Sequence, residues 1–213
     1  AFTNMGSRIP QNQADGLKSL QRAQEVYFSQ GITTIHDGLV RQPEWGLLQA
    51  AASQGLLRGD VAAYIDIKDS AALLEEHRDF LGHYRSRLKI AGYKLFLDGS
   101  PQGRTAWMTQ PYLEGEPDYR GYPIYQDQQV LGFLEKAQRE QVQIVTHCNG
   151  DAAAEQLLRC YEKVYREYGN PIRPVMIHAQ LLRPDQVPRL RDLGMIASFF
   201  VAHVYHWGDI HVK

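Results

Sequence analysis

Short apolar runs alternate with amphipathic stretches along most of the chain. Apolar runs rich in β-branched residues and flanked by turn residues are typical of buried strands, whereas apolar positions at helical spacing are typical of surface helices. The pattern predicts strands at residues 32–36, 61–67, 90–97, 142–147, 175–178 and 195–201. It predicts helices at residues 15–29, 44–54, 70–84, 128–140, 151–168 and 184–193.

Regular alternation of strands and helices implies an α/β fold with a parallel sheet and right-handed crossovers. Two architectures fit this alternation: an open, doubly wound sheet and a closed (β/α)8 TIM barrel. No glycine-rich phosphate loop follows any predicted strand, so the nucleotide-binding form of the open sheet has no support. About six βα units are two fewer than a barrel contains. We therefore expect residues 1–213 to form one incomplete (β/α)8 barrel domain that lacks strands one and eight.

Three segments lack a clear helix or strand pattern. Residues 98–126 form a long insertion rich in Gly, Pro and Tyr, and such segments inside a compact domain are most often binding loops. Residues 1–13 are polar and are expected to form a loop, and the aromatic, His-rich residues 202–213 give no definite prediction.

Two histidines occupy positions where α/β folds keep their chemistry. His147 and His178 each end an apolar run that is followed by polar residues and a helix. The carboxyl ends of parallel strands meet at one edge of a sheet, and neutral imidazoles from neighbouring strands can share a zinc-like ion. Either histidine alone could equally be an ordinary polar residue at a strand end. The pair predicts a metal site.

Lys94 lies inside the predicted strand 90–97, where a charged amine is costly to bury. Three solutions are open. The amine faces the barrel mouth, it pairs with an acid such as Asp98, or it reacts with CO2 to form an anionic carbamate that can bridge two metals. Burial lowers the pKa of an amine and so favours the neutral nucleophile that this reaction needs. From the strand pattern alone, the unmodified lysine is the simpler interpretation.

Charge and composition narrow the range of partners. A formal net charge of -1 gives no bulk attraction to nucleic acid or to an anionic membrane, and no apolar run approaches the ~20 residues of a spanning helix. The two cysteines, Cys148 and Cys160, are placed too far apart for a disulfide, so a cytoplasmic protein is expected. We expect a small-molecule substrate as partner and leave a homo-oligomer open.

Four motifs occur in a characteristic order, and they are residues 31–38 (GITTIHDG), 93–106 (YKLFLDGS with RTA), 146–151 (THCNGD) and 177–180 (IHAQ). Together they resemble the metal-dependent amidohydrolase superfamily. They are most similar to its amidohydrolase-3 branch, which includes N-substituted formamide deformylase. The resemblance implies a (β/α)8 barrel with one or two divalent metals, with zinc expected. It also implies hydrolysis of C–N bonds in amides, formamides or cyclic amides by a metal-activated water.

The resemblance also implies roles for three residues. The family's lysine ligand, often carbamylated, falls on Lys94, and its histidine ligands on strands five and six fall on His147 and His178. The His-x-His of strand one and the aspartate base of strand eight have no match here. We therefore expect the general base outside this chain, and the 213-residue chain alone to be inactive or nearly so. The alternative is a non-catalytic barrel that binds a small molecule or a protein partner.

Substrate contacts are expected from two further places in the chain. One is the start of the long loop, and the other is the tail after the last strand. A solvated loop is the competing interpretation for the first. The candidates are Ser100, Arg104, His203 and His206.

Overall fold

The structure is a computed structural model that describes residues 12–212. The chain forms two compact units, divided after Ala91, and both combine helices with parallel strands. The predicted α/β class is therefore confirmed. Most of the loop predicted for residues 1–13 lies outside the described residues, and Gln13 already belongs to a helix. None of the described helices combines the length and apolar character needed to cross a membrane.

The first unit contains two complete strands and the start of a third. Strands β1 and β2 pair in parallel, with Thr34 opposite Asp60 and Ile35 opposite Val61. Helix α3 buries Trp45 and Leu48 in the core of this unit. The elements are α2 (Gln13–Ser29), β1 (Thr34–Val40), α3 (Gln42–Ser53), β2 (Asp60–Asp66), α4 (Ala72–Glu76), the 3-10 turn η1 (Arg78–Phe80) and the first residues of β3 (Leu88–Phe96).

Two predictions fail in the first unit. The single helix expected over residues 70–84 stops at Glu76, because only Leu73 and Leu74 are buried and the polar residues after them offer no continuing apolar face. The strand predicted to end at residue 36 runs further. Strand β1 continues to Val40, whose side chain is fully buried, although its register with β2 shifts after Asp37.

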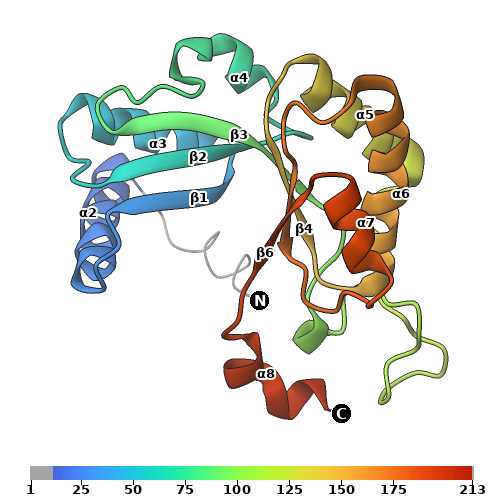
Figure 1. The fold of residues 1–213 in the computed structure, drawn as a ribbon. Helices are drawn as coiled ribbons and strands as arrows, with labels where there is room; N and C mark the ends of the chain where they lie inside the picture. Colours follow the sequence, from blue (N-terminus) through green and yellow to red (C-terminus); the bar gives the residue numbers. More distant parts are fainter. Residues whose placement is uncertain (1–11, 213) are drawn as a thin grey trace. The chain divides into compact units, whose positions relative to one another are not determined.

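In the second unit the remaining strands pair in parallel in the order of the sequence, β3 to β6. Figure 1 shows helices α5, α6 and α7 together on one side of these strands. The elements after β3 are η2 (Pro101–Gly103), α5 (Asp127–Arg139), β4 (Ile144–Cys148), α6 (Asp151–Tyr168), β5 (Val175–His178), α7 (Gln186–Asp192), β6 (Ile196–Phe199) and α8 (His203–His211). The tail without a definite prediction is therefore helical over most of its length.

The register of β3 and β4 decides which side chains share a face. Lys94 pairs with Val145, and Phe96 pairs with His147. Because side chains two residues apart in a strand point to the same side, Lys94, Phe96 and His147 share one face of the sheet. Tyr93 points the other way, and its hydroxyl donates a hydrogen bond of 2.7 Å to Glu140 at the end of α5.

Candidate functional site

Lys94 is buried in strand β3. Its side chain is only 4% exposed, and its Nζ atom lies 4.6 Å from the centroid of the Phe96 ring. No carboxylate among the described residues lies within ion-pair distance of this amine, so the second of the three solutions, an ion pair with Asp98, does not occur. Burial lowers the pKa of Lys94 to about 8, which increases the fraction of neutral amine at neutral pH.

Asp98 instead joins the start of the long loop to the end of β4. Its buried carboxylate accepts hydrogen bonds from the backbone N–H groups of Trp107 at 3.0 Å, Asn149 at 3.0 Å and Gly150 at 2.7 Å. Burial raises the pKa of Asp98 to about 6. The three backbone donors act in the opposite direction, because each favours the ionised carboxylate and so lowers the pKa. Asp98 therefore has a structural role, because its hydrogen bonds fix the start of the long loop against the end of β4.

His147 is fixed in one tautomer by its surroundings. Its Nε2 atom lies 2.8 Å from the carbonyl oxygen of Gly99 and 3.6 Å from Asp98 Oδ1. Asn149 Nδ2 donates to the same Gly99 carbonyl at 2.7 Å. Asn149 Nδ2 also lies 3.1 Å from Nε2. Because a carbonyl oxygen can only accept, the shorter contact to Gly99 favours the tautomer with the proton on Nε2 and the lone pair on Nδ1. Burial lowers the pKa of His147 to about 4, so the ring is neutral at pH 7.

His178 lies beside His147 at the end of β5, with 4.7 Å between the ring centroids. Its Nδ1 atom is buried and has no hydrogen-bond partner among the described residues. Burial, and then the charge of Lys94, lowers the pKa of His178 to about 4. Both imidazoles therefore keep a lone pair at neutral pH, as metal ligation requires.

The backbone at His178 adopts a conformation that is unfavourable for residues with a Cβ atom. His178 has a φ of 72° and Ala179 a φ of 47°, both in the left-handed region. Hydrogen bonds from Ala179 N to Cys148 O (3.1 Å) and from Leu181 N to Asn149 O (3.0 Å) hold the turn against β4. Strained backbone of this kind is concentrated at functional sites.

His203 adds a third imidazole from α8. Its ring centroid lies 5.6 Å from that of His178, and both of its ring nitrogens are buried without a hydrogen-bond partner among the described residues. His147, His178 and His203 thus form a row of rings. A donor or acceptor on a bound molecule would satisfy the nitrogens of His203.

The donor set fits a divalent metal under one condition. Both imidazoles are neutral, His178 Nδ1 has no hydrogen-bond partner among the described residues, and the buried amine of Lys94 lacks an acidic partner. Within residues 12–212 no three His, Cys, Asp or Glu side chains lie together as a ready ligand set. Among the described residues, Lys94 is the remaining candidate for a third protein ligand.

The other predicted substrate residues are dispersed. Ser100 stabilises its own turn, because its carbonyl accepts the N–H groups of Gly103, Thr105 and Ala106. Arg104 forms an ion pair of 3.0 Å with Glu114 on the wall of a cavity, whereas His206 is exposed beside Tyr205. Their roles in binding stay predictions.

Sequence reasoning missed the residues that orient His147. Asn149 and Gly99 both lie in the motifs quoted above, but neither was assigned a role. The signal was the conjunction of Asp98-Gly99 after one strand and His147-Cys148-Asn149 after the next. Such segments meet only once the strands pair. Cys148 is buried, and burial raises the pKa of its thiol well above the ordinary value, so it stays protonated.

Two curated relatives share part of the sequence. One is the Bacillus subtilis protein named "Putative amidohydrolase YtcJ". It is 28% identical over 123 residues, which are 56% of this chain and 23% of YtcJ. Protein LONG AFTER FAR-RED 3 of Arabidopsis thaliana is 25% identical over 207 residues, which are 92% of this chain and 35% of that protein.

Two solved structures share the fold. Both are uncharacterized metal-dependent hydrolases, one from Pyrococcus horikoshii and one from Pyrococcus furiosus. The first has a TM-score of 0.77 and 25% identity over 94% of this chain and 40% of its own. The second has a TM-score of 0.79 and 24% identity over 98% of this chain and 43% of its own. These similarities confirm the partial TIM barrel.

The chain spans less than half of each of these four proteins. A family model nevertheless matches it from residue 1 to residue 213, and that model describes the amidohydrolase family in its amidohydrolase-3 form. With a parallel α/β fold, two neutral histidines at adjacent strand ends and a buried lysine on the same sheet, the chain belongs to the amidohydrolase family.

Proposed function

We propose that this chain carries the metal-ligand side of a hydrolase that cleaves C–N bonds other than peptide bonds in small molecules. Amides, formamides and cyclic amides are the substrate class that we propose. The observation that supports the proposal most is the convergence of His147, His178 and the buried Lys94 in one unit.

Each residue has a separate role in this proposal. His147 offers Nδ1 because Gly99 holds the proton on Nε2, and His178 offers its unpartnered Nδ1. The neutral Lys94 amine adds to CO2 and releases one proton, which leaves an anionic carbamate as the third ligand. A bound divalent ion, zinc in our proposal, would polarise the substrate carbonyl and lower the pKa of a water molecule. His203 contacts the substrate through its free ring nitrogens.

The metal site is tested by zinc titration of the 213-residue chain in a calorimeter. We expect His147→Ala, His178→Ala and Lys94→Met each to weaken zinc binding by about 10- to 100-fold or more. His206→Ala, which changes an exposed histidine of α8, is the matched control and should bind as tightly as the parent chain. Equal affinity in all five proteins would refute the proposed ligand set.

The carbamate is tested separately with 13C-labelled bicarbonate. We expect a carbamate carbonyl resonance in the NMR spectrum of the zinc-loaded parent chain and its absence in Lys94→Met. A resonance that persists in Lys94→Met would place the modification elsewhere, and no resonance in either protein would leave Lys94 as an unmodified amine.

A non-catalytic binding protein is the second candidate, and one observation favours it. Asp98 is the buried carboxylate nearest the histidines, but three backbone donors occupy it, so it is poorly placed to act as a general base. Hydrolysis of N-substituted formamides, acetamides and cyclic amides, lost with a chelator and restored by zinc, would support the enzyme. Zinc binding without turnover is expected of the 213-residue chain under either candidate, because the general base is expected outside it.

A further inference from the structure

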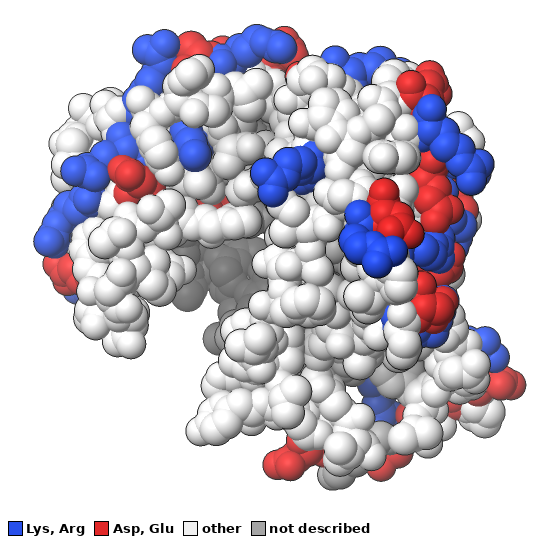
Figure 2. Space-filling model, in the orientation of Figure 1, with Lys and Arg blue, Asp and Glu red and all other residues white. Residues whose placement is uncertain are grey.

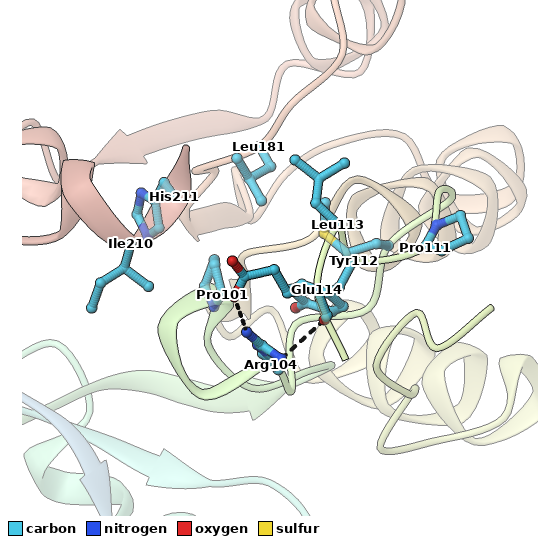
Figure 3. Close-up of a pocket in the computed structure, with 10 residues that line it drawn as sticks. Pro101, Arg104, Pro111, Tyr112, Leu113, Glu114, Leu181, Ile210 and His211 are labelled. Carbon is cyan, nitrogen blue, oxygen red and sulfur yellow. Dashed lines mark hydrogen bonds and ion pairs between the residues drawn. The ribbon is translucent and has the colours of Figure 1, made fainter. Parts of the chain in front are cut away.

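A second feature of this unit is an apolar cavity next to the histidine row. It has a volume of about 220 Å3 and lies between the long loop, the segment after β5 and helix α8 (Figure 3). Leu181 and Ile210 face it from one side, and Pro101, Met108 and Tyr112 face it from the loop.

The charged groups in this wall are already neutralised by each other. Arg104 Nη2 lies 3.0 Å from Glu114 Oε2, and Arg104 Nη1 donates to the Glu114 carbonyl at 2.9 Å. The hydroxyl of Tyr112 is also used, since it donates to Ala106 O at 2.8 Å. An ion entering the cavity would have to displace these partners, so the cavity favours a neutral, apolar group.

The cavity lies next to the candidate metal site. A neighbouring hollow of about 280 Å3 is lined by His178 and His203, and it shares Leu181 and His211 with the apolar cavity. A molecule with its polar group beside His178 can therefore extend an apolar substituent past Leu181 into the cavity.

The dimensions and the surface around the cavity limit what that substituent can be. An apolar cavity of roughly 150 Å3 is enough to hold benzene, so about 220 Å3 suits one substituted ring or a short branched alkyl group. Helix α8 carries a single charged residue, Asp209, whereas basic and acidic side chains alternate over α6 and α7 (Figure 2). The approach to the cavity past α8 is thus largely uncharged.

We propose that this cavity binds a neutral, ring-sized apolar substituent of the substrate, with Leu181 and Ile210 setting its size limit. This inference rests on the proposed function in one respect. It takes the bound molecule to be the substrate, whose polar end is assigned to the histidine row. The cavity itself is defined by its lining residues alone, and binding to it can be measured without metal or turnover.

The test uses 19F NMR on the metal-free 213-residue chain with three probes of similar shape: 4-fluorobenzyl alcohol, 4-fluorobenzoate and 4-fluorobenzylammonium. We expect the neutral alcohol to bind about tenfold more tightly than either ion. Tighter binding of the benzoate would show that Arg104 leaves Glu114 to bind anions, and would overturn the proposal.

Leu181→Trp fills the cavity and should weaken binding of the alcohol about tenfold. Val187→Trp, at an exposed position on α7, is the matched control and should leave binding unchanged. If Leu181→Trp fails to fold by circular dichroism, Ile210→Trp on the exposed helix α8 provides the same test. Unchanged binding in the filled variant would overturn the assignment of the cavity.

A last comparison separates this inference from the proposed function. Binding of the neutral probe by a chain that takes up no metal would count against the proposed function and leave the cavity assignment standing. Metal uptake without probe binding would overturn the cavity alone. With both present, Mn2+ should broaden the probe's 19F line in the parent chain but not in His178→Ala, and equal broadening in both would separate the cavity from the histidine row.

Discussion

Asp98 illustrates how the role of a single residue depends on its partners. Its place at the end of the lysine strand suggested an ion pair with Lys94, but its carboxylate is saturated by three backbone N–H groups from two other segments. Lys94 is left with the ring of Phe96 and the nearby histidines. The same carboxylate that fails to neutralise the lysine therefore organises the surroundings of His147.

Asp98→Asn should destabilise the chain by about 1–3 kcal/mol at pH 7.5, because an amide nitrogen would replace an oxygen that accepts backbone N–H groups, while removal of the buried charge offsets part of the loss. Urea unfolding measures this loss. Asp209→Asn, an exposed change on α8, is the control and should stay within about 0.5 kcal/mol. A loss below about 1 kcal/mol for Asp98→Asn would contradict the role assigned to the three donors.

At the scale of elements, the long loop depends on a close approach between two backbones. Gly150 precedes α6, and a Cβ atom placed there would lie 1.9 Å from the carbonyl oxygen of Trp107. The same carbonyl accepts a hydrogen bond of 3.1 Å from Ala152 N. The backbone conformation at Gly150 is one that any residue can adopt. Glycine is required there because a Cβ atom would collide with the carbonyl group of Trp107.

Gly150→Ala should cost about 2–3 kcal/mol of stability, since the loop backbone must move away from the start of α6. Gly132→Ala, in the middle of α5 with open space around the new methyl group, is the matched control. The control should gain about 0.5–1 kcal/mol from its higher helix propensity. Thermal or urea unfolding of both proteins decides, and similar stabilities would contradict the close approach.

Helices α5 and α6 are joined by an ion pair whose pH dependence can be predicted. Hydrogen bonds from the Arg159 guanidinium, at 2.6 and 2.7 Å, lower the pKa of Asp127 from 3.8 to about 2. Because the folded-state pKa lies below the unfolded value, the carboxylate stabilises the fold above about pH 4. That contribution disappears as the pH falls through 2.

Asp127→Asn should therefore be less stable than the parent chain at pH 6, and the difference should narrow between pH 4 and pH 2. Since the two side chains are 40% and 36% exposed, solvent screening limits the difference to about 1 kcal/mol. Urea unfolding at a series of pH values measures it, and high salt should reduce it. A difference that does not change with pH would exclude the ion pair as its source.

For the whole molecule, a ligand that binds only the folded chain must raise its stability. Zinc at about 100 times its dissociation constant should contribute about 2.7 kcal/mol, which corresponds to a rise in Tm of about 5–10 °C for a chain of this length. Chelation should reverse the shift, and the double variant His147→Ala/His178→Ala should show none. An equal shift in the double variant would mean that the metal binds elsewhere.

The element pattern and the types of chemically active residue were determined by the sequence itself. Apolar runs and amphipathic stretches are local, so strands such as β3 and β4 and helices such as α5 and α6 were predicted within a few residues. Lys94, His147 and His178 were recognisable because strand-end and in-strand polar residues are conspicuous against an apolar run. The same local reasoning was wrong for residues 70–84, which form a short helix and a 3-10 turn, and it gave no definite prediction for residues 202–213, most of which form α8.

Only the tertiary structure decided which partners these residues have. The tautomer of His147 depends on Gly99, the isolation of Lys94 depends on Asp98 turning to Asn149 and Gly150, and the apolar cavity needs α8 beside the long loop. Each of these contacts joins segments that are far apart in the chain. A pattern along the sequence records what a residue is, whereas pairing and packing determine what it touches, and the chemistry of this site depends on both.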